Sequence, residues 1–155
     1  FGWSKEPTKF EDRLSLEYEP INEEKSWGEK WESAWFHLEG RVPEEWAGQT
    51  VAANLDFSGE GLVFSKDGEV VQGKTNASIW DPNFARPRVP LIDSSKGGED
   101  IELWVEAAAN SLFGVFTDPD PEKDNPKRHG WFDAKVETLK FGIFDSDLWH
   151  LYLDA

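Results

Sequence analysis

Ionisable side chains that could carry acid–base or metal chemistry are numerous in this sequence, but their spacing matches no catalytic pattern. With 31 Asp and Glu residues, neighbouring carboxylates such as Glu44 and Glu45 are expected by chance. The three histidines, His37, His129 and His150, are isolated and lack the spacing of a metal-binding motif. No arrangement of Ser, His and Asp indicates nucleophilic catalysis. The sequence therefore predicts no catalytic residue and no metal ligand in this chain.

A run of oxygen-bearing side chains between Asp118 and Asn125 offers the type of ligand that Ca²⁺ prefers. Its spacing does not match the known calcium-binding loop, and prolines interrupt it. We interpret the run as a solvated surface loop, with calcium binding as the alternative that the sequence leaves open.

Aromatic and cationic residues are the remaining candidates for a binding surface. The stretch from Gln72 to Pro90 lacks a clear hydrophobic period, so we expect a long loop there. It contains Trp80, Arg86 and Arg88, which would form a local positive and aromatic patch. Because arginine pairs with carboxylates or hydroxyl groups and stacks on indole rings, the patch suits contact with another domain or a sugar. The alternative is that both arginines neutralise nearby acids such as Asp81 or Asp93.

Asn110 and Trp149 are two further candidates for contact with a neighbouring domain or a carbohydrate. Asn110 opens a run ending at Gly114, which we expect to end a core strand and turn the chain, with Phe113 anchoring the turn. Trp149 falls off the apolar stripe of an expected C-terminal helix. We therefore expect Trp149 to be exposed here and to contact a partner outside this chain.

Composition and charge exclude several classes of protein. The 155 residues fit one domain, and nine Trp and eleven Phe residues provide the apolar surface that disordered chains lack. The formal net charge of −15 argues against nucleic acid or an anionic membrane as a partner. No apolar run is long enough to span a membrane, and no signal peptide is recognisable. The absence of cysteine suits a cytoplasmic protein, and the absence of methionine leads us to expect a piece of a longer protein.

Alternation of apolar and polar residues predicts short strands over most of the chain. Asp67 and Gly68 lie between two such runs, as in a tight hairpin. The pattern predicts an all-β protein, an antiparallel β-sandwich or jelly roll, because the helical periods of a βαβ fold are missing. The expected core residues are Phe36, Leu38, Val51, Ala53, Leu55, Leu62, Phe64, Ile101, Leu103, Val105 and Val136.

The last eleven residues change to a helical period. Asp145 and Ser146 are suitable capping residues, so we expect a helix beginning near residue 146. Its apolar stripe, Leu148, Leu151 and Tyr152, is expected to pack on the sandwich. We therefore divide the chain into a variable N-terminal segment (1–26), a β-sandwich domain (27–144) and the start of a helix or linker (145–155).

Four segments of the chain carry recognisable motifs in order. They are Pro43–Gly48 with Trp27 and Trp35–Phe36 before it, Glu60–Gly73, Leu103–Gly114, and Phe144–Asp154. Together they resemble the N-terminal region of family 38 glycoside hydrolases, the α-mannosidases of the cytosolic and vacuolar type and their bacterial relatives. The resemblance covers roughly Trp27 to Ala155. It implies a jelly roll similar to galactose-binding domains, in agreement with the strand pattern.

The resemblance also implies that the parent protein is a zinc-dependent retaining α-mannosidase, whose Asp nucleophile and zinc lie in a separate downstream domain. None of those motifs lies in this chain, so we expect no cofactor in it and a noncatalytic N-terminal role. Domain packing against the downstream catalytic domain, contacts in a homo-oligomer and the rim of the sugar cleft are the roles considered. The alternatives are an autonomous carbohydrate-binding module, with a glycan as partner, and a small stand-alone enzyme.

Overall fold

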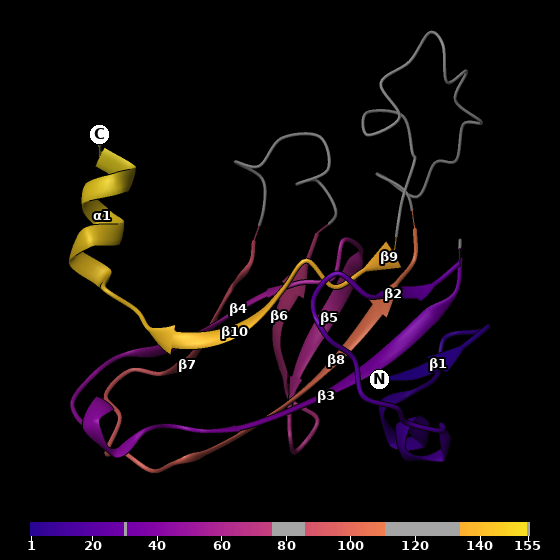
Figure 1. The fold of residues 1–155 in the computed structure, drawn as a ribbon, viewed down its shortest axis with the longest axis horizontal. Helices are drawn as coiled ribbons and strands as arrows, with labels where there is room; N and C mark the ends of the chain where they lie inside the picture. The colour runs from indigo at the N-terminus through magenta and orange to yellow at the C-terminus, as the bar shows by residue number, and fades with distance from the viewer. Residues whose placement is uncertain (30, 76–85, 111–133, 155) are drawn as a thin grey trace, which may run out of the picture.

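The computed structural model describes residues 1–29, 31–75, 86–110 and 134–154, which form mainly β-strands (Figure 1). The helical elements of these residues are the 3₁₀ helices η1 (Phe10–Ser15) and η2 (Glu44–Trp46) and the α-helix α1 (Ser146–Asp154). The strands are β1 (Gly2–Ser4), β2 (Ser26–Gly28), β3 (Ser33–Arg41), β4 (Val51–Asp56), β5 (Glu60–Ser65), β6 (Val70–Lys74), β7 (Arg88–Ile92), β8 (Asp100–Ala108), β9 (Ala134–Lys135) and β10 (Thr138–Ile143).

The strands form two main sheets whose inner faces share one core. One sheet has five strands in the order β1-β3-β8-β5-β6, and the other has three in the order β10-β4-β7. Strands β2 and β9 make a separate two-stranded sheet. All strand pairs among the described residues are antiparallel. The predicted antiparallel β-sandwich is confirmed.

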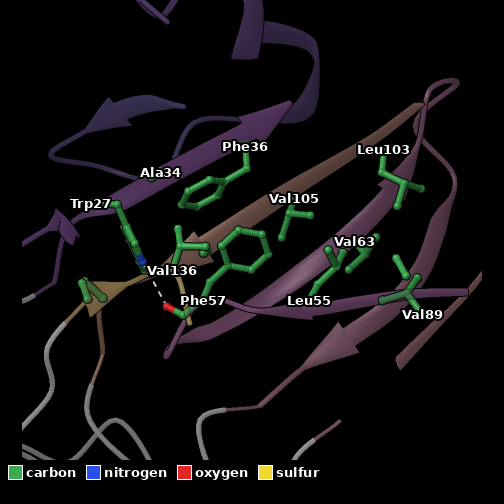
Figure 2. Packing of buried hydrophobic residues seen from close by; sticks show 14 residues of the cluster. Trp27, Ala34, Phe36, Leu55, Phe57, Val63, Val89, Leu103, Val105 and Val136 are labelled. Atoms are coloured by element: carbon green, nitrogen blue, oxygen red, sulfur yellow. Dashed lines mark hydrogen bonds between the residues drawn. The ribbon is translucent and has the colours of Figure 1, made fainter. Parts of the chain in front are cut away.

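The main core lies between the two sheets (Figure 2). Phe36 on β3, Val63 on β5 and Val105 on β8 come from the five-stranded sheet, and Leu55 on β4 and Val89 on β7 come from the three-stranded sheet. Of the predicted core residues, Phe36, Val51, Ala53, Leu55, Leu103, Val105 and Val136 are buried, and Leu38 and Ile101 pack against the core while partly exposed. Period-2 alternation therefore located most of this core correctly.

Leu62 and Phe64 also pack in a hydrophobic cluster, with Phe64 buried and Leu62 partly buried, but this cluster is not the one between the sheets. Both lie on the outer face of the five-stranded sheet, in a second cluster with Trp35 and Trp104, whereas Val63 between them enters the main core. Successive side chains of a strand point to opposite faces, and this strand is apolar on both. The alternation of apolar and polar residues therefore does not show which face of β5 lies against the main core and which lies against another segment of the chain.

The N-terminal strap, residues 1–21, covers this second cluster. The ring of Phe10 on η1 lies 5.8 Å from that of Trp35 and 5.2 Å from that of Phe64. The Arg13 guanidinium lies 3.6 Å from the Phe10 ring centroid and 4.3 Å from that of Trp104. The strap also supplies β1, which pairs with β3. The strap therefore covers the part of the outer face that carries Trp35, Phe64 and Trp104, whereas Val70 on the edge strand β6 stays exposed.

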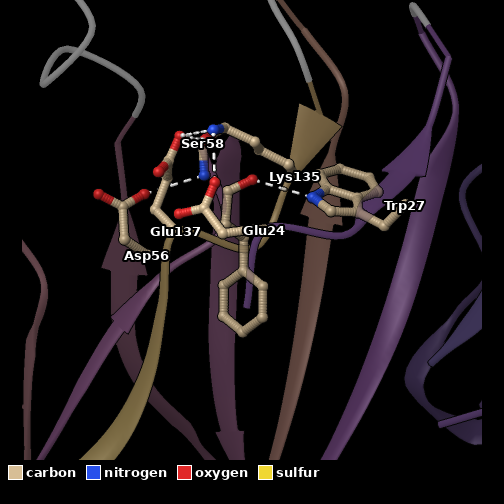
Figure 3. A network of polar contacts seen from close by, with 7 residues as sticks. Glu24, Trp27, Asp56, Ser58, Lys135 and Glu137 are labelled. Carbon is tan, nitrogen blue, oxygen red and sulfur yellow. Dashed lines mark hydrogen bonds and ion pairs between the residues drawn. The ribbon is translucent and has the colours of Figure 1, made fainter. Parts of the chain in front are cut away.

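A polar network lies at one end of the sandwich (Figure 3). Lys135 Nζ lies 3.1 Å from Glu24 Oε2 and 3.3 Å from Glu137 Oε1, and the Ser58 hydroxyl donates to Glu137 Oε1 at 3.2 Å. Beside it the buried Trp27 donates its indole N–H to the Phe57 carbonyl oxygen at 3.0 Å. The carboxylates here hold β9 against the end of β4 and do not form a free acid–base pair.

Helix α1 begins at Ser146, as predicted, and Asp145 caps it. The Asp145 carboxylate accepts from the Leu148 backbone N–H at 2.9 Å, and its carbonyl accepts from the Trp149 N–H at 3.1 Å. The predicted packing of the apolar stripe on the sandwich is wrong. Leu148 is 62% exposed and Tyr152 68%, because the helix leaves the end of β10 and stands clear of both sheets (Figure 1).

Turns and loops differ in how well the sequence predicted them. The hairpin at Asp67 and Gly68 is confirmed, with Gly68 at φ +87° between β5 and β6. The predicted loop from Gln72 to Pro90 is wrong at both ends, because these ends pair as strands β6 and β7. Phe113 and the run from Asp118 to Asn125 lie outside the described residues.

Candidate functional site

A groove of about 570 Å³ lies over the three-stranded sheet, and polar side chains on the outer face of this sheet line it. Arg88 on β7, Asn54 on β4 and Lys140 on β10 are direct cross-strand partners. Their side chains therefore form one row across the sheet. Phe144 and Trp149, which follow β10, and Arg86, which precedes β7, also line the groove. We call this surface, defined by these six residues, the cationic groove.

Aromatic rings support the Arg88 side chain. Its guanidinium carbon lies 4.3 Å from the ring centroid of Phe144 and 5.7 Å from that of Trp149. Both distances fit cation–π contacts. Such contacts do not use the guanidinium N–H groups, which can still donate hydrogen bonds to a planar acceptor such as a carboxylate.

Two side chains of β6 hold the backbone that carries the arginines. Gln72 Nε2 donates to the carbonyl oxygens of Arg86 at 3.2 Å and of Arg88 at 2.8 Å. Lys74 Nζ also donates to the Arg86 carbonyl oxygen. Burial of its ammonium group lowers the pKa of Lys74 to about 8, with Asp56 opposing and Arg86 adding to this shift. The position of both arginines is thus set by contacts across the edge between the two sheets.

The charges of the groove are only partly compensated. Among the residues that the structure describes, Arg86 and Arg88 form no ion pair, so neutralisation by Asp93 is not observed, and Asp81 lies outside the described residues. Lys140 Nζ lies 3.6 Å from Glu23 Oε2, and the other oxygen of Glu23 accepts from the Leu139 backbone N–H. The groove is therefore a positive surface on a chain whose net charge is −15.

Three of the five predicted contact residues, Arg86, Arg88 and Trp149, come together in this groove. Asn110 does not, because it is buried just after β8, where its amide donates to Glu60 Oε2 at 2.6 Å. Trp80 lies outside the described residues. The sequence suggested the arginines and the tryptophan separately, but nothing in it indicated that β7 and β10 flank the same strand, β4.

Asn54, Lys140, Gln72 and Phe144 were missed as groove residues. Asn54 and Lys140 occupy the polar positions of otherwise alternating strands, which is the ordinary pattern for a solvated face. Only the pairing of β4 with both β7 and β10 aligns them with Arg88. Asn54 and Lys140 could have been identified as groove residues only from the register of β4 with β7 and β10.

The groove can bind anionic and aromatic groups but offers no acid–base chemistry. Its ionisable lining residues, Arg86, Arg88 and Lys140, are all cationic, and the carboxylate nearest to Lys140, that of Glu23, is not part of the lining. Within the described ranges, no cluster of three or more His, Asp or Glu side chains fits a metal ion. None of the helices in those ranges is long and apolar enough to cross a membrane.

Comparisons with known proteins agree with this architecture. The family model described as the α-mannosidase jelly roll domain matches residues 2–135. Alpha-mannosidase G of Dictyostelium discoideum is 33% identical over 113 residues, which are 73% of this chain and 10% of that protein. Alpha-mannosidase 2C1 of Homo sapiens is 33% identical over 119 residues (74% and 11%), and that of Mus musculus is 29% identical over 150 residues (94% and 13%).

The chain thus spans only about a tenth of the length of these curated relatives. The family match nevertheless covers most of the chain itself, and it includes every strand of the five-stranded sheet. Its description as a jelly roll agrees with the antiparallel sandwich observed here. The chain therefore belongs to the family of α-mannosidase jelly roll domains.

Proposed function

We propose that this chain is the noncatalytic N-terminal domain of an α-mannosidase and that it packs on the rest of that protein through α1 and the cationic groove. The observation that supports this most is the exposure of α1: Leu148, Leu151 and Leu153 are all at least 60% exposed. A helix that is apolar around most of its circumference is normally buried. An adjoining domain of the same protein would bury it.

The size of the relatives supports the same proposal. The matched part of each named α-mannosidase is 10% to 13% of its length, so most of each relative lies outside the region shared with this chain. In the proposed arrangement, the nucleophile and zinc of a family 38 retaining glycosidase belong to that larger part. The described residues here do not fit a zinc ion, since no suitable cluster of ligands is present among them.

Packing on the catalytic domain is preferred over the other roles. A carbohydrate-binding module needs an exposed platform of aromatic rings. Trp27 and Trp35 are buried in the two apolar clusters, and the exposed Trp31 does not line the groove, so these residues do not favour an autonomous module. Contacts in a homo-oligomer and a place at the rim of the sugar cleft remain compatible with a domain docked by its cationic groove. A cytoplasmic location is part of the proposal, and fractionation of cells that express the full-length protein would test it.

The test compares stability of the chain with activity of the full-length protein. Trp149→Ala and Arg86→Ala are expected to change the free energy of unfolding of the 155-residue chain by less than about 0.5 kcal/mol, because both side chains lie at the surface. In the full-length protein each is expected to lower hydrolysis of an aryl α-mannoside by about threefold or more, because the catalytic domain loses part of its support. Activity should be measured at saturating and limiting substrate concentrations.

Trp31→Ala is the matched control, since Trp31 is 54% exposed and does not line the groove. It should leave activity unchanged. The isolated chain should not hydrolyse the aryl mannoside. Full activity of the Trp149 and Arg86 variants, or an equal loss in the Trp31 variant, would contradict packing through this surface.

A further inference from the structure

We propose that the cationic groove binds an acidic segment of the same polypeptide, C-terminal to residue 155, whose carboxylates pair with Arg88 and Lys140. This inference rests on the proposed function, because it requires a larger protein in which the domain is docked. It adds the chemistry of the contact, which the exposed apolar helix does not specify.

The row of side chains sets the geometry of this contact. Arg88 and Lys140 lie on the two strands that flank β4, in register with Asn54. Neighbouring strands are about 4.8 Å apart, so the two cations start about 10 Å from each other. Two carboxylates of one short segment can match that spacing, with Asn54 between them as a hydrogen-bonding partner for backbone groups.

The Arg88 side chain is already prepared for a carboxylate. The rings of Phe144 and Trp149 lie within cation–π distance of the guanidinium, and Gln72 donates a hydrogen bond to the backbone carbonyl of Arg88. A long side chain held in this way loses less conformational entropy on binding than a free one. Its bidentate N–H pairs then favour a planar carboxylate over a single hydroxyl group.

Charge favours an acidic protein segment over other occupants. A nucleic acid carries a charge at every phosphate, so it would extend beyond the two cations onto a chain whose net charge is −15, whereas a short acidic segment can place its charges at the groove alone. A neutral sugar would gain little from two cations about 10 Å apart. An acidic segment uses both cations, and it lies within reach because α1, which carries the chain toward residue 155, supplies Trp149 to the groove.

Zero-length carbodiimide cross-linking of the full-length protein tests this pairing, because it joins amines only to carboxylates in direct contact. Peptide mass spectrometry should find Lys140 joined to an Asp or Glu beyond residue 155. The link from Lys140 to Glu23, whose charged atoms lie 3.6 Å apart, is an internal positive control. Arg88→Glu should lower the yield of the new link by more than half, because it repels the acidic segment.

Arg41→Glu is the matched charge reversal, since Arg41 pairs with Asp100 at 2.8 Å and does not line the groove. It should leave the Lys140 link unchanged. The inference is overturned if Lys140 links only to Glu23, if the link joins two protein molecules and doubles the mass, or if both reversals act equally. If the backbone of the groove is nevertheless protected from hydrogen exchange in the full-length protein, the proposed docking stands and only its acidic chemistry fails.

Discussion

The two outer faces of the sandwich differ in exposure: one is apolar and covered, and the other is charged and exposed. On the five-stranded sheet, Trp35, Phe64 and Trp104 are at most 9% exposed, because the N-terminal strap lies over them. On the three-stranded sheet, the row formed by Arg88, Asn54 and Lys140 is exposed in the described part of the chain. The N-terminal strap of the chain itself covers the part of the outer face of the five-stranded sheet that carries these rings. The outer face of the three-stranded sheet instead exposes charged side chains, with aromatic rings at its border.

This difference follows from the cost of leaving each kind of surface in water. Three large aromatic side chains are worth several kcal/mol when buried, so the strap gains much by covering them. Exposed cations cost little free energy in water, and they contribute to stability only when an anionic partner binds. The covered face is therefore expected to determine the stability of the chain, and the cationic face its association.

The largest effect should come from removing an aromatic ring of the covered face. Trp104→Ala deletes a ring that stacks on His37 at 3.9 Å and contacts Arg13 and Tyr18. Loss of these contacts should cost about 3–5 kcal/mol of unfolding free energy. Trp149→Ala, the same substitution on the other face, should cost almost nothing. If urea unfolding shows equal losses of unfolding free energy in the two variants, the proposed difference between the two faces is wrong.

A smaller effect is expected where the strap meets the β5–β6 hairpin. A Cβ on Gly68 would lie 2.7 Å from Cε1 of Phe10, in addition to the strain of its φ of +87°. Gly48, with φ +82° and no atom near an added Cβ, is the matched control for strain alone. Gly48→Ala should cost about 1 kcal/mol and Gly68→Ala about 1 kcal/mol more, measured by chemical denaturation. If the two losses are the same, Phe10 does not pack tightly in the strap.

A pH-dependent effect is expected at Lys74, which contacts the Arg86 backbone across the edge between the two sheets. Its pKa is lowered by burial from 10.5 to about 8 in the folded chain. Below pH 8 Lys74 is protonated in both the folded and the unfolded chain, so the cost of the buried charge is fully present. Between pH 8 and 10.5 the unfolded chain binds more protons, so stability should rise with pH relative to Lys74→Met. Parallel stability curves for the two proteins would show that Lys74 is not buried.

The sequence predicted the sandwich and most of its core because alternation is clear in β3, β4 and β8. It assigned Leu62 and Phe64 to the core but could not show that they belong to a second cluster, because β5 is apolar on both faces and the strap that covers one of them is distant in the sequence. It identified Arg86, Arg88 and Trp149 by residue type. Their proximity to Lys140 and Asn54 depends on the register of β4 with two non-consecutive strands, which local sequence does not encode.

The predicted packing of α1 on the sandwich was wrong for a related reason. The Asp145 cap is a local feature, so the start of the helix could be predicted correctly. Burial of Leu148, Leu151 and Tyr152 needs an opposing surface, and hydrophobic period alone does not reveal which surface that is. In our account the rest of the full-length protein provides it.

Hydrogen exchange of the isolated chain and the full-length protein, followed peptide by peptide, tests the account most directly. We expect peptides from β4, β7, β10 and α1 to exchange more slowly in the full-length protein, because docking covers the cationic groove and the helix. Peptides from η1 and β1 should exchange equally in both, because the strap already covers that face. Equal exchange of the groove and α1 in the two proteins, or added protection only at the strap, would contradict the account.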